Sequence, residues 1–199
     1  TTGADNTAIG YNALAANTTA SNNTAVGKSA LVANTTGADN VSVGKDSMVS
    51  NTTGSDNTAL GLGALASNSS ASNNTAVGRS ALLSNTTGYS NTAIGGQTLI
   101  SNTTGINNAA VGRYALYNNT TGGSNTAMGL QALFTATTAS NNTAVGYQAL
   151  LANTTGQYNV AVGTSALDAN TTADNNAAFG FEALTSNTTG AANTSVGRL

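Results

Sequence analysis

A five-residue motif, Asn-Thr-Ala-Ile-Gly at residues 6–10, recurs every 17 residues along the whole chain without an insertion or a deletion. Such a strict period means that each repeat stacks on the next in one register. We number the repeat from the motif asparagine, position 1, to the residue before the next asparagine, position 17. Residues 1–199 are therefore a single repeat array, and neither end departs from the pattern. We interpret the chain as a segment of a longer fibre, or as a unit that stacks end to end.

The pattern inside each repeat predicts an all-β parallel solenoid (β-roll) of about twelve turns. Position 2 is Thr, Val or Ala, position 3 is always tiny, and position 4 is always large and apolar. We predict a short strand there, with positions 2 and 4 facing inward. Positions 8–10 predict a second strand, with the Leu or Met at position 9 facing opposite to its neighbours. A helix is excluded, because the large apolar residues at positions 4 and 9 are five apart and Gly or Asn interrupts the pattern.

Two invariant residues define the expected structural ladder. The position 1 asparagines should hydrogen-bond to one another along the axis, and the position 5 glycines should mark a corner with positive φ or with close backbone approach. The asparagines are Asn6, Asn23, Asn40, Asn57, Asn74, Asn91, Asn108, Asn125, Asn142, Asn159, Asn176 and Asn193. The glycines are Gly10, Gly27, Gly44, Gly61, Gly78, Gly95, Gly112, Gly129, Gly146, Gly163, Gly180 and Gly197. Position 15 is Gly or Ala, so that turn does not require positive φ.

The composition argues against several classes of function. The chain has no His or Cys, and its seven carboxylates are spread over several turns, so we expect no enzyme activity and no cofactor. A net charge of −2 does not favour nucleic acid or anionic membranes, and no apolar stretch is long enough to span a bilayer. We expect no secretory signal peptide within residues 1–199. The absence of Cys is compatible with an extracellular protein that lacks disulfides.

Two further patterns suggest sites, and each has a structural alternative. Asp39 and Asp56, both at position 17, would stack and offer oxygen ligands to calcium, but two solvated aspartates is the reading we favour. Asn-x-Thr sequons occur in nearly every turn, as at Asn17, Asn34 and Asn51. Glycans about 4.8 Å apart would collide, so these asparagines are expected to form ladders instead.

A second apolar stripe bears on the number of chains. Position 10 is largely hydrophobic, and positions 3 and 8 are kept small, which lets a neighbouring backbone approach closely. On a lone coil the stripe would be exposed, whereas two symmetry-related copies would bury it. We therefore predict a homotrimer, with a monomeric solenoid as the alternative.

The motif Asn-Thr-Ala-Val-Gly followed by x-x-Ala-Leu resembles the head-domain repeat of trimeric autotransporter adhesins. That resemblance implies a left-handed parallel β-roll of three intertwined subunits. The longer unit at residues 142–156 is similar to repeats of phage tail-fibre-type proteins that end in a self-cleaving chaperone domain. The repeat is longer than that of the adhesin heads, and the Asn-Thr-Thr-Gly loop supplies the extra residues.

The sequence thus predicts a structural, non-enzymatic segment of an extracellular adhesin or fibre that attaches to an unidentified surface receptor. Contacts are expected from the variable positions, at Tyr11, Lys28, Lys45, Arg79, Tyr89, Arg113, Tyr114, Tyr147 and Phe181. Ice binding is one alternative, because regular Thr arrays on flat solenoids order water. Against it, the Thr pair at positions 13 and 14 is adjacent and should diverge, and the Thr at position 2 is expected inside. A self-polymerising filament is the other alternative.

Overall fold

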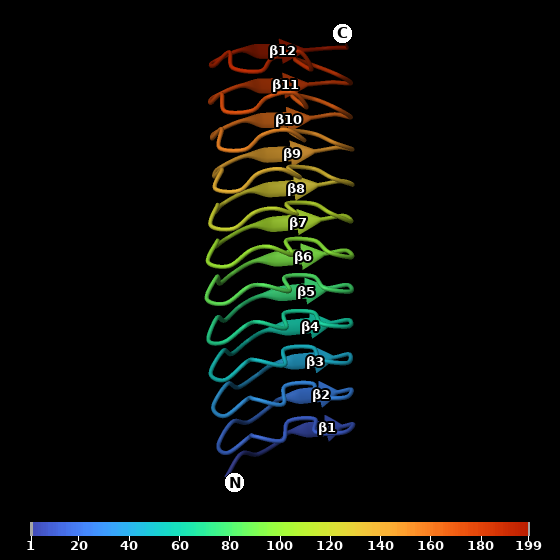
Figure 1. The fold of residues 1–199 in the computed structure, drawn as a ribbon, viewed down its shortest axis with the longest axis vertical. Helices are drawn as coiled ribbons and strands as arrows, with labels where there is room; N and C mark the ends of the chain where they lie inside the picture. The colour runs from blue at the N-terminus through green and yellow to red at the C-terminus, as the bar shows by residue number, and fades with distance from the viewer. Residues whose placement is uncertain (1, 199) are drawn as a thin grey trace.

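The computed structural model describes residues 2–198 as one continuous coil of stacked turns (Figure 1). Each turn contributes a three-residue strand, and the strands form one parallel sheet in sequence order. Their bounds are β1 Thr7–Ile9, β2 Thr24–Val26, β3 Val41–Val43, β4 Thr58–Leu60, β5 Thr75–Val77, β6 Thr92–Ile94, β7 Ala109–Val111, β8 Thr126–Met128, β9 Thr143–Val145, β10 Val160–Val162, β11 Ala177–Phe179 and β12 Thr194–Val196. No helix occurs within residues 2–198, so the predicted all-β parallel solenoid is confirmed.

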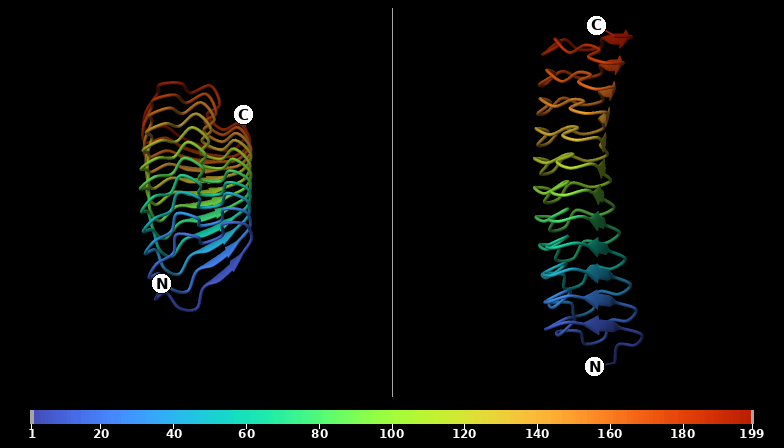
Figure 2. Two further views of the ribbon diagram at one scale, coloured as in Figure 1. Left: turned by 60° about the horizontal axis from the view of Figure 1, so that its bottom comes forward. Right: turned by 90° about the vertical axis from the view of Figure 1, so that its right-hand side faces the viewer.

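The register follows the 17-residue period without a slip. Thr24 in β2 pairs with Thr7 in β1 and with Val41 in β3, and every later pair of strands repeats this offset. Backbone hydrogen bonds join the turns, as where the Thr24 amide donates to the Asn40 carbonyl at 2.8 Å. Like residues therefore stack about 4.8 Å apart, which gives a rod about 55 Å long (Figure 2).

The strands face the opposite way from the prediction. The middle residue of each strand, at position 3, is buried in β2 to β11, while positions 2 and 4 lie on the outer surface. The reason is the narrow interior of the coil. Ser42 Oγ at position 3 lies 2.5 Å from Ser47 Oγ at position 8 of the same turn, so these positions meet directly. Only small side chains fit between the two walls there, and the larger position 4 residues are left outside.

The predicted second strand at positions 8–10 is also wrong, because this wall is a series of tight turns. Positions 7 and 9 adopt left-handed backbone conformations, with φ of 57° at Ser29 and 50° at Leu31. A strand needs extended φ, so the ladder cannot form through them. Instead, the Ala30 amide bonds to the Gly27 carbonyl at 3.3 Å. Positions 8 and 9 are both buried, and position 10 is half-buried on the outside of this wall.

The core is a single column of Leu and Met side chains with alanines on either side. The fully buried members at position 9 are Leu31, Met48, Leu65, Leu82, Leu99, Leu116, Leu133, Leu150 and Leu167. The glycine corner is confirmed at position 5: Gly61 has φ of 136°, and a Cβ there would lie 2.6 Å from the Gly78 carbonyl oxygen. At position 15, by contrast, Gly37 does not have positive φ, in agreement with the alanines found there.

Candidate functional site

The position 1 asparagines form the predicted ladder. Those from Asn23 to Asn176 are at most 1% exposed. Oδ1 of Asn91 accepts hydrogen bonds from the backbone N–H of Asn108 at 3.0 Å and from the side-chain Nδ2 of Asn108 at 3.1 Å. The Asn91 side chain in turn donates to Oδ1 of Asn74 at 3.3 Å. Each asparagine therefore joins its own turn to the turns before and after it.

A second ladder lies at position 12, and it shares an acceptor with the first. Nδ2 of Asn51 donates to Oδ1 of Asn34 at 2.9 Å, which links consecutive turns. Within one turn, the Gly54 carbonyl accepts from Asn40 at position 1, at 2.9 Å, and from Asn51 at position 12, at 3.0 Å. The two side chains therefore converge on one carbonyl oxygen of the return loop. This cross-link explains why both positions need an amide that donates and accepts.

The threonines at position 13 also form hydrogen bonds between consecutive turns. The hydroxyl of Thr86 donates to the Thr103 carbonyl of the next turn at 3.0 Å, and Thr103 repeats this bond to Thr120. The threonines at position 14, such as Thr87 and Thr104, are exposed. The Asn-Thr-Thr loop is thus part of the stacking scaffold.

The sequons and the aspartate pair follow from the same architecture. Asn34 and Asn51 are fully buried ladder members, so the predicted ladder reading of the sequons is confirmed for them. Asp39 and Asp56 have φ of 58° and 57°, a left-handed conformation that Asn and Asp adopt more readily than most residues. Backbone geometry therefore accounts for acidic residues at position 17. Among the described residues, no three His, Cys, Asp or Glu side chains gather into a group that could hold a metal ion.

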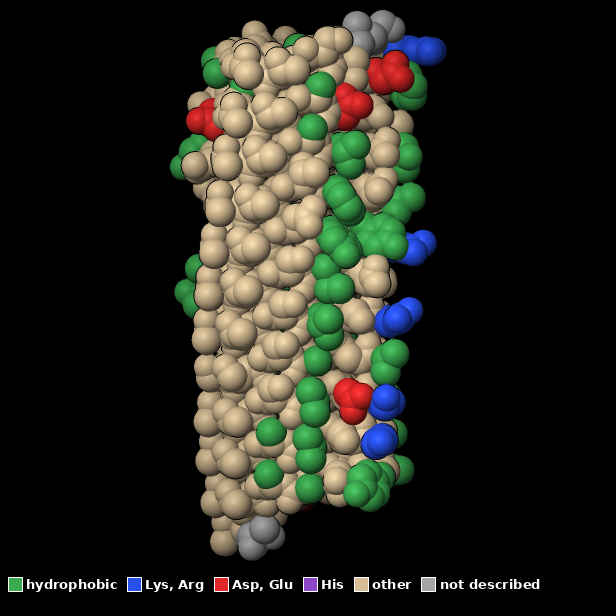
Figure 3. Space-filling model, in the orientation of Figure 1, with side chains coloured by type: hydrophobic (Ala, Val, Ile, Leu, Met, Phe, Trp, Pro, Cys, Tyr) green, Lys and Arg blue, Asp and Glu red, His purple; other side chains and the backbone are tan. Residues whose placement is uncertain are grey.

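The predicted contact residues lie mainly along one edge of the rod. All five Lys and Arg residues of the chain occupy position 6, directly after the glycine corner. In Figure 3 these basic side chains line the right-hand edge. Tyr11, Tyr147 and Phe181 belong to the same column and are 71%, 45% and 42% exposed. Tyr89, at position 16, is exposed on a different corner of the turn. We call the position 6 column the basic edge.

An aromatic cluster beside the basic edge was missed by the sequence reasoning. Tyr117 and Phe134, consecutive position 10 residues, stack with ring centroids 5.2 Å apart, and Tyr114 meets Tyr117 edge-to-face at 5.4 Å. The Arg113 guanidinium lies over the Tyr114 ring, 4.4 Å from its centroid. The sequence signal was the run of large residues at position 10, which includes Leu83, Ile100 and Leu151. They form the hydrophobic stripe that runs up the rod in Figure 3.

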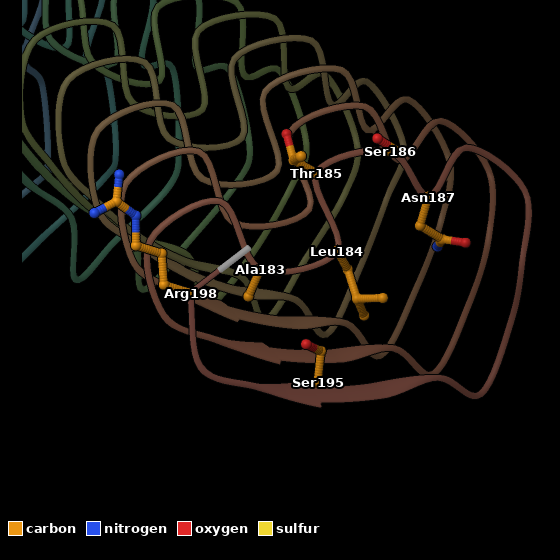
Figure 4. A pocket seen from close by; sticks show the side chains of 7 residues that line it. All are labelled: Ala183, Leu184, Thr185, Ser186, Asn187, Ser195 and Arg198. Atoms are coloured by element: carbon orange, nitrogen blue, oxygen red, sulfur yellow. The ribbon is translucent and has the colours of Figure 1, made fainter.

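A cavity of about 290 Å³ opens at the β12 end of the rod. Figure 4 shows Leu184 and Ser195 pointing into it from opposite walls. These are positions 9 and 3, which are buried in the preceding turns. The cavity is therefore the interior of the coil seen in cross-section, and it offers no separate ligand site.

Within residues 2–198, no helix is long and apolar enough to cross a membrane. The chain was also compared with protein families, curated proteins and solved structures. No family model, no curated protein and no solved structure matches it.

Proposed function

We propose that this chain is a stiff, non-enzymatic segment of an extracellular fibre or adhesin, which holds attachment contacts at a distance from their anchor. The observation that carries the proposal is the uninterrupted register of the twelve strands, with the Asn ladders buried inside the coil. Such an array gains length by adding turns, and each turn is stabilised by its neighbours. The resemblance to adhesin heads and tail-fibre repeats points the same way.

Attachment would be made from the basic edge. Its cations occupy one column, and Lys45 is the only one paired with a carboxylate among the described residues, with Asp46 at 3.3 Å. A row of like charges attracts anionic groups on a surface, and salt screens this attraction. The expected ligand class is therefore an anionic surface polymer.

The proposed trimer would pack through the wall opposite the sheet. The small residues at positions 3 and 8, which predicted a close approach of another chain, are used inside one coil. These small residues therefore do not support a trimer. The half-buried stripe of Leu83, Ile100, Tyr117, Phe134 and Leu151 still does, because a continuous apolar stripe on a soluble rod is expected to be covered.

Light scattering on the purified chain tests the assembly. A trimer predicts three times the chain mass of 19.4 kDa. The double variant Leu83→Asp/Ile100→Asp should reduce it to one chain, whereas Thr87→Asp/Thr104→Asp, on exposed loop positions, should not. A wild-type mass of one chain contradicts the trimer. Electron microscopy distinguishes separate rods from end-to-end filaments.

A binding assay on beads coated with anionic or neutral polysaccharide tests the attachment surface. The wild-type chain should bind the anionic beads and be released by salt. The variant Lys28→Gln/Lys45→Gln/Arg79→Gln should bind more weakly, because it removes three charges from the basic edge. Equal binding to both kinds of bead, or equal binding by the variant, would refute this role for the edge.

A further inference from the structure

The outward side of the sheet is a regular surface with no assigned role. We call it the sheet face: the first and third residues of strands β1 to β12, at positions 2 and 4. These side chains are exposed or half-buried, and in β2 to β11 the small residue between them is buried in the core. The face therefore presents two parallel columns along the rod. Rows repeat about every 4.8 Å along the axis, and the two residues of a row lie about 6.6 Å apart along the strand.

The position 2 column carries hydroxyl groups that the protein itself does not use. Its threonines make no side-chain hydrogen bond to another described residue, unlike those at position 13, where Thr86 and Thr103 donate to the next turn. A threonine hydroxyl has one donor and two acceptor sites, so these groups bond to water. The eight threonines are Thr7, Thr24, Thr58, Thr75, Thr92, Thr126, Thr143 and Thr194. In the other four rows, the two valines keep the γ-methyl group but lack the hydroxyl, and the two alanines lack both.

The scaffold beneath the face holds these groups at fixed positions. Strands β4 to β6 are joined through parallel backbone pairing, and the buried Asn74 and Asn91, which precede Thr75 and Thr92 in the chain, are hydrogen-bonded to each other. The hydroxyls and methyls therefore form a periodic lattice, and ordered waters bridging rigid polar groups bind at low entropic cost. We propose that the sheet face binds ice, with the threonine hydroxyls anchoring a layer of ordered water that merges with the crystal surface.

Charge and area favour ice over a second protein chain as the occupant. No residue at position 2 or position 4 of the twelve strands is charged, and an uncharged surface suits a neutral lattice of water. Two columns about 55 Å long and about 10 Å wide offer about 550 Å², whereas each partner in a standard protein interface buries about 800 Å². A protein partner would also bury the hydroxyls without a complementary set of partners, whereas ice keeps them hydrogen-bonded.

The sequence pattern argued against ice binding because it placed the position 2 threonines inside the coil. The position 2 threonines were expected inside, and they lie outside. The position 4 column also faces outward, because the position 3 residue between the two columns packs into the coil. The adjacent threonines at positions 13 and 14 are not needed for the array.

Thermal hysteresis, ice-crystal shaping and uptake of labelled protein into growing ice test the proposal with the chain as it is. The wild type should show all three. The double variant Thr75→Lys/Thr92→Lys should lower ice uptake by at least about tenfold, because ammonium groups are costly to dehydrate. The matched control Thr87→Lys/Thr104→Lys adds the same charge at exposed position 14 and should behave as the wild type.

Circular dichroism and melting temperature must be unchanged in both variants, which separates loss of binding from loss of folding. The proposal is overturned if the wild type shows no hysteresis or uptake, or if the control variant loses as much as the sheet-face variant. It is also overturned if light scattering shows that only the sheet-face variant dissociates an oligomer, since the face would then be a protein interface. The assembly and bead assays test the fibre proposal separately. A negative result in them does not change what the hysteresis and ice-uptake measurements say about the sheet face.

Discussion

Ala136 occupies the ladder position that follows Asn119, and the buried Oδ1 of Asn119 has no hydrogen-bond partner among the described residues. In other turns this oxygen accepts from the next asparagine, as Asn102 accepts from Asn119 at 2.8 Å. Ala136 provides no donor, so the second ladder is interrupted at one rung. The gap shows that the ladder is built rung by rung and tolerates one missing member.

Restoring that rung should stabilise the coil. The variant Ala136→Asn would donate to Asn119 and accept from Asn153, whose Nδ2 now donates only to the Gly156 carbonyl. A satisfied hydrogen bond contributes about 0.5–1.5 kcal/mol, so the melting temperature should rise. Calorimetry measures this, and a lowered melting temperature would show that the site cannot accommodate the larger side chain.

Removing a rung of the first ladder should have the opposite effect. The variant Asn91→Ala would leave the buried Asn108 amide without its acceptor, at a cost of about 1–3 kcal/mol. Asn118→Ala is the control, because its side chain makes no hydrogen bond with another described residue. Denaturant unfolding should separate the two variants. Equal stabilities would mean that the ladder is not a source of stability.

Two neighbouring glycines predict effects of opposite sign. Gly95 has φ of 135°, and a Cβ there would lie 2.8 Å from the Gly112 carbonyl carbon, whereas a Cβ at Gly96 would meet nothing within 4 Å. Gly95→Ala should therefore destabilise by more than about 1 kcal/mol, and Gly96→Ala should stabilise by about 0.4–1 kcal/mol through the unfolded state. Thermal melts of both variants test this. A harmless Gly95→Ala would disprove the close approach at the corner.

The left-handed conformation at position 9 predicts a restriction on the shape of core residues. Leu116 has φ of 50° and is fully buried, and no β-branched residue occurs at this position in any turn. The variant Leu116→Ile should cost more than the about 1.5 kcal/mol expected for a volume-conserving swap, because β-branched side chains tolerate positive φ poorly. Leu116→Met should stay within that limit. Unfolding experiments that rank the two variants equally would contradict this reasoning.

Much of the scaffold could be predicted from the sequence because it repeats. The period specified the parallel register, the invariant asparagines predicted the ladder, and the invariant glycines predicted the corner. The contact residues Lys28 and Arg113 were assigned to the surface because position 6 varies freely. The cluster of Tyr114 with Tyr117 and Phe134 was not predicted, because it depends on how positions 7 and 10 meet in space, both within one turn and between adjacent turns.

The sequence by itself determined which residues stack on which, since a strict period leaves one register. The tertiary structure decided which side of each strand faces inward. Alternation of Thr, Ala and Val has the same period in either orientation. The choice depends on the distance between the two walls, which Ser42 and Ser47 reveal as direct contact. Because only small residues fit that gap, Ala packs inside and the threonines that we propose for ice binding lie on the surface.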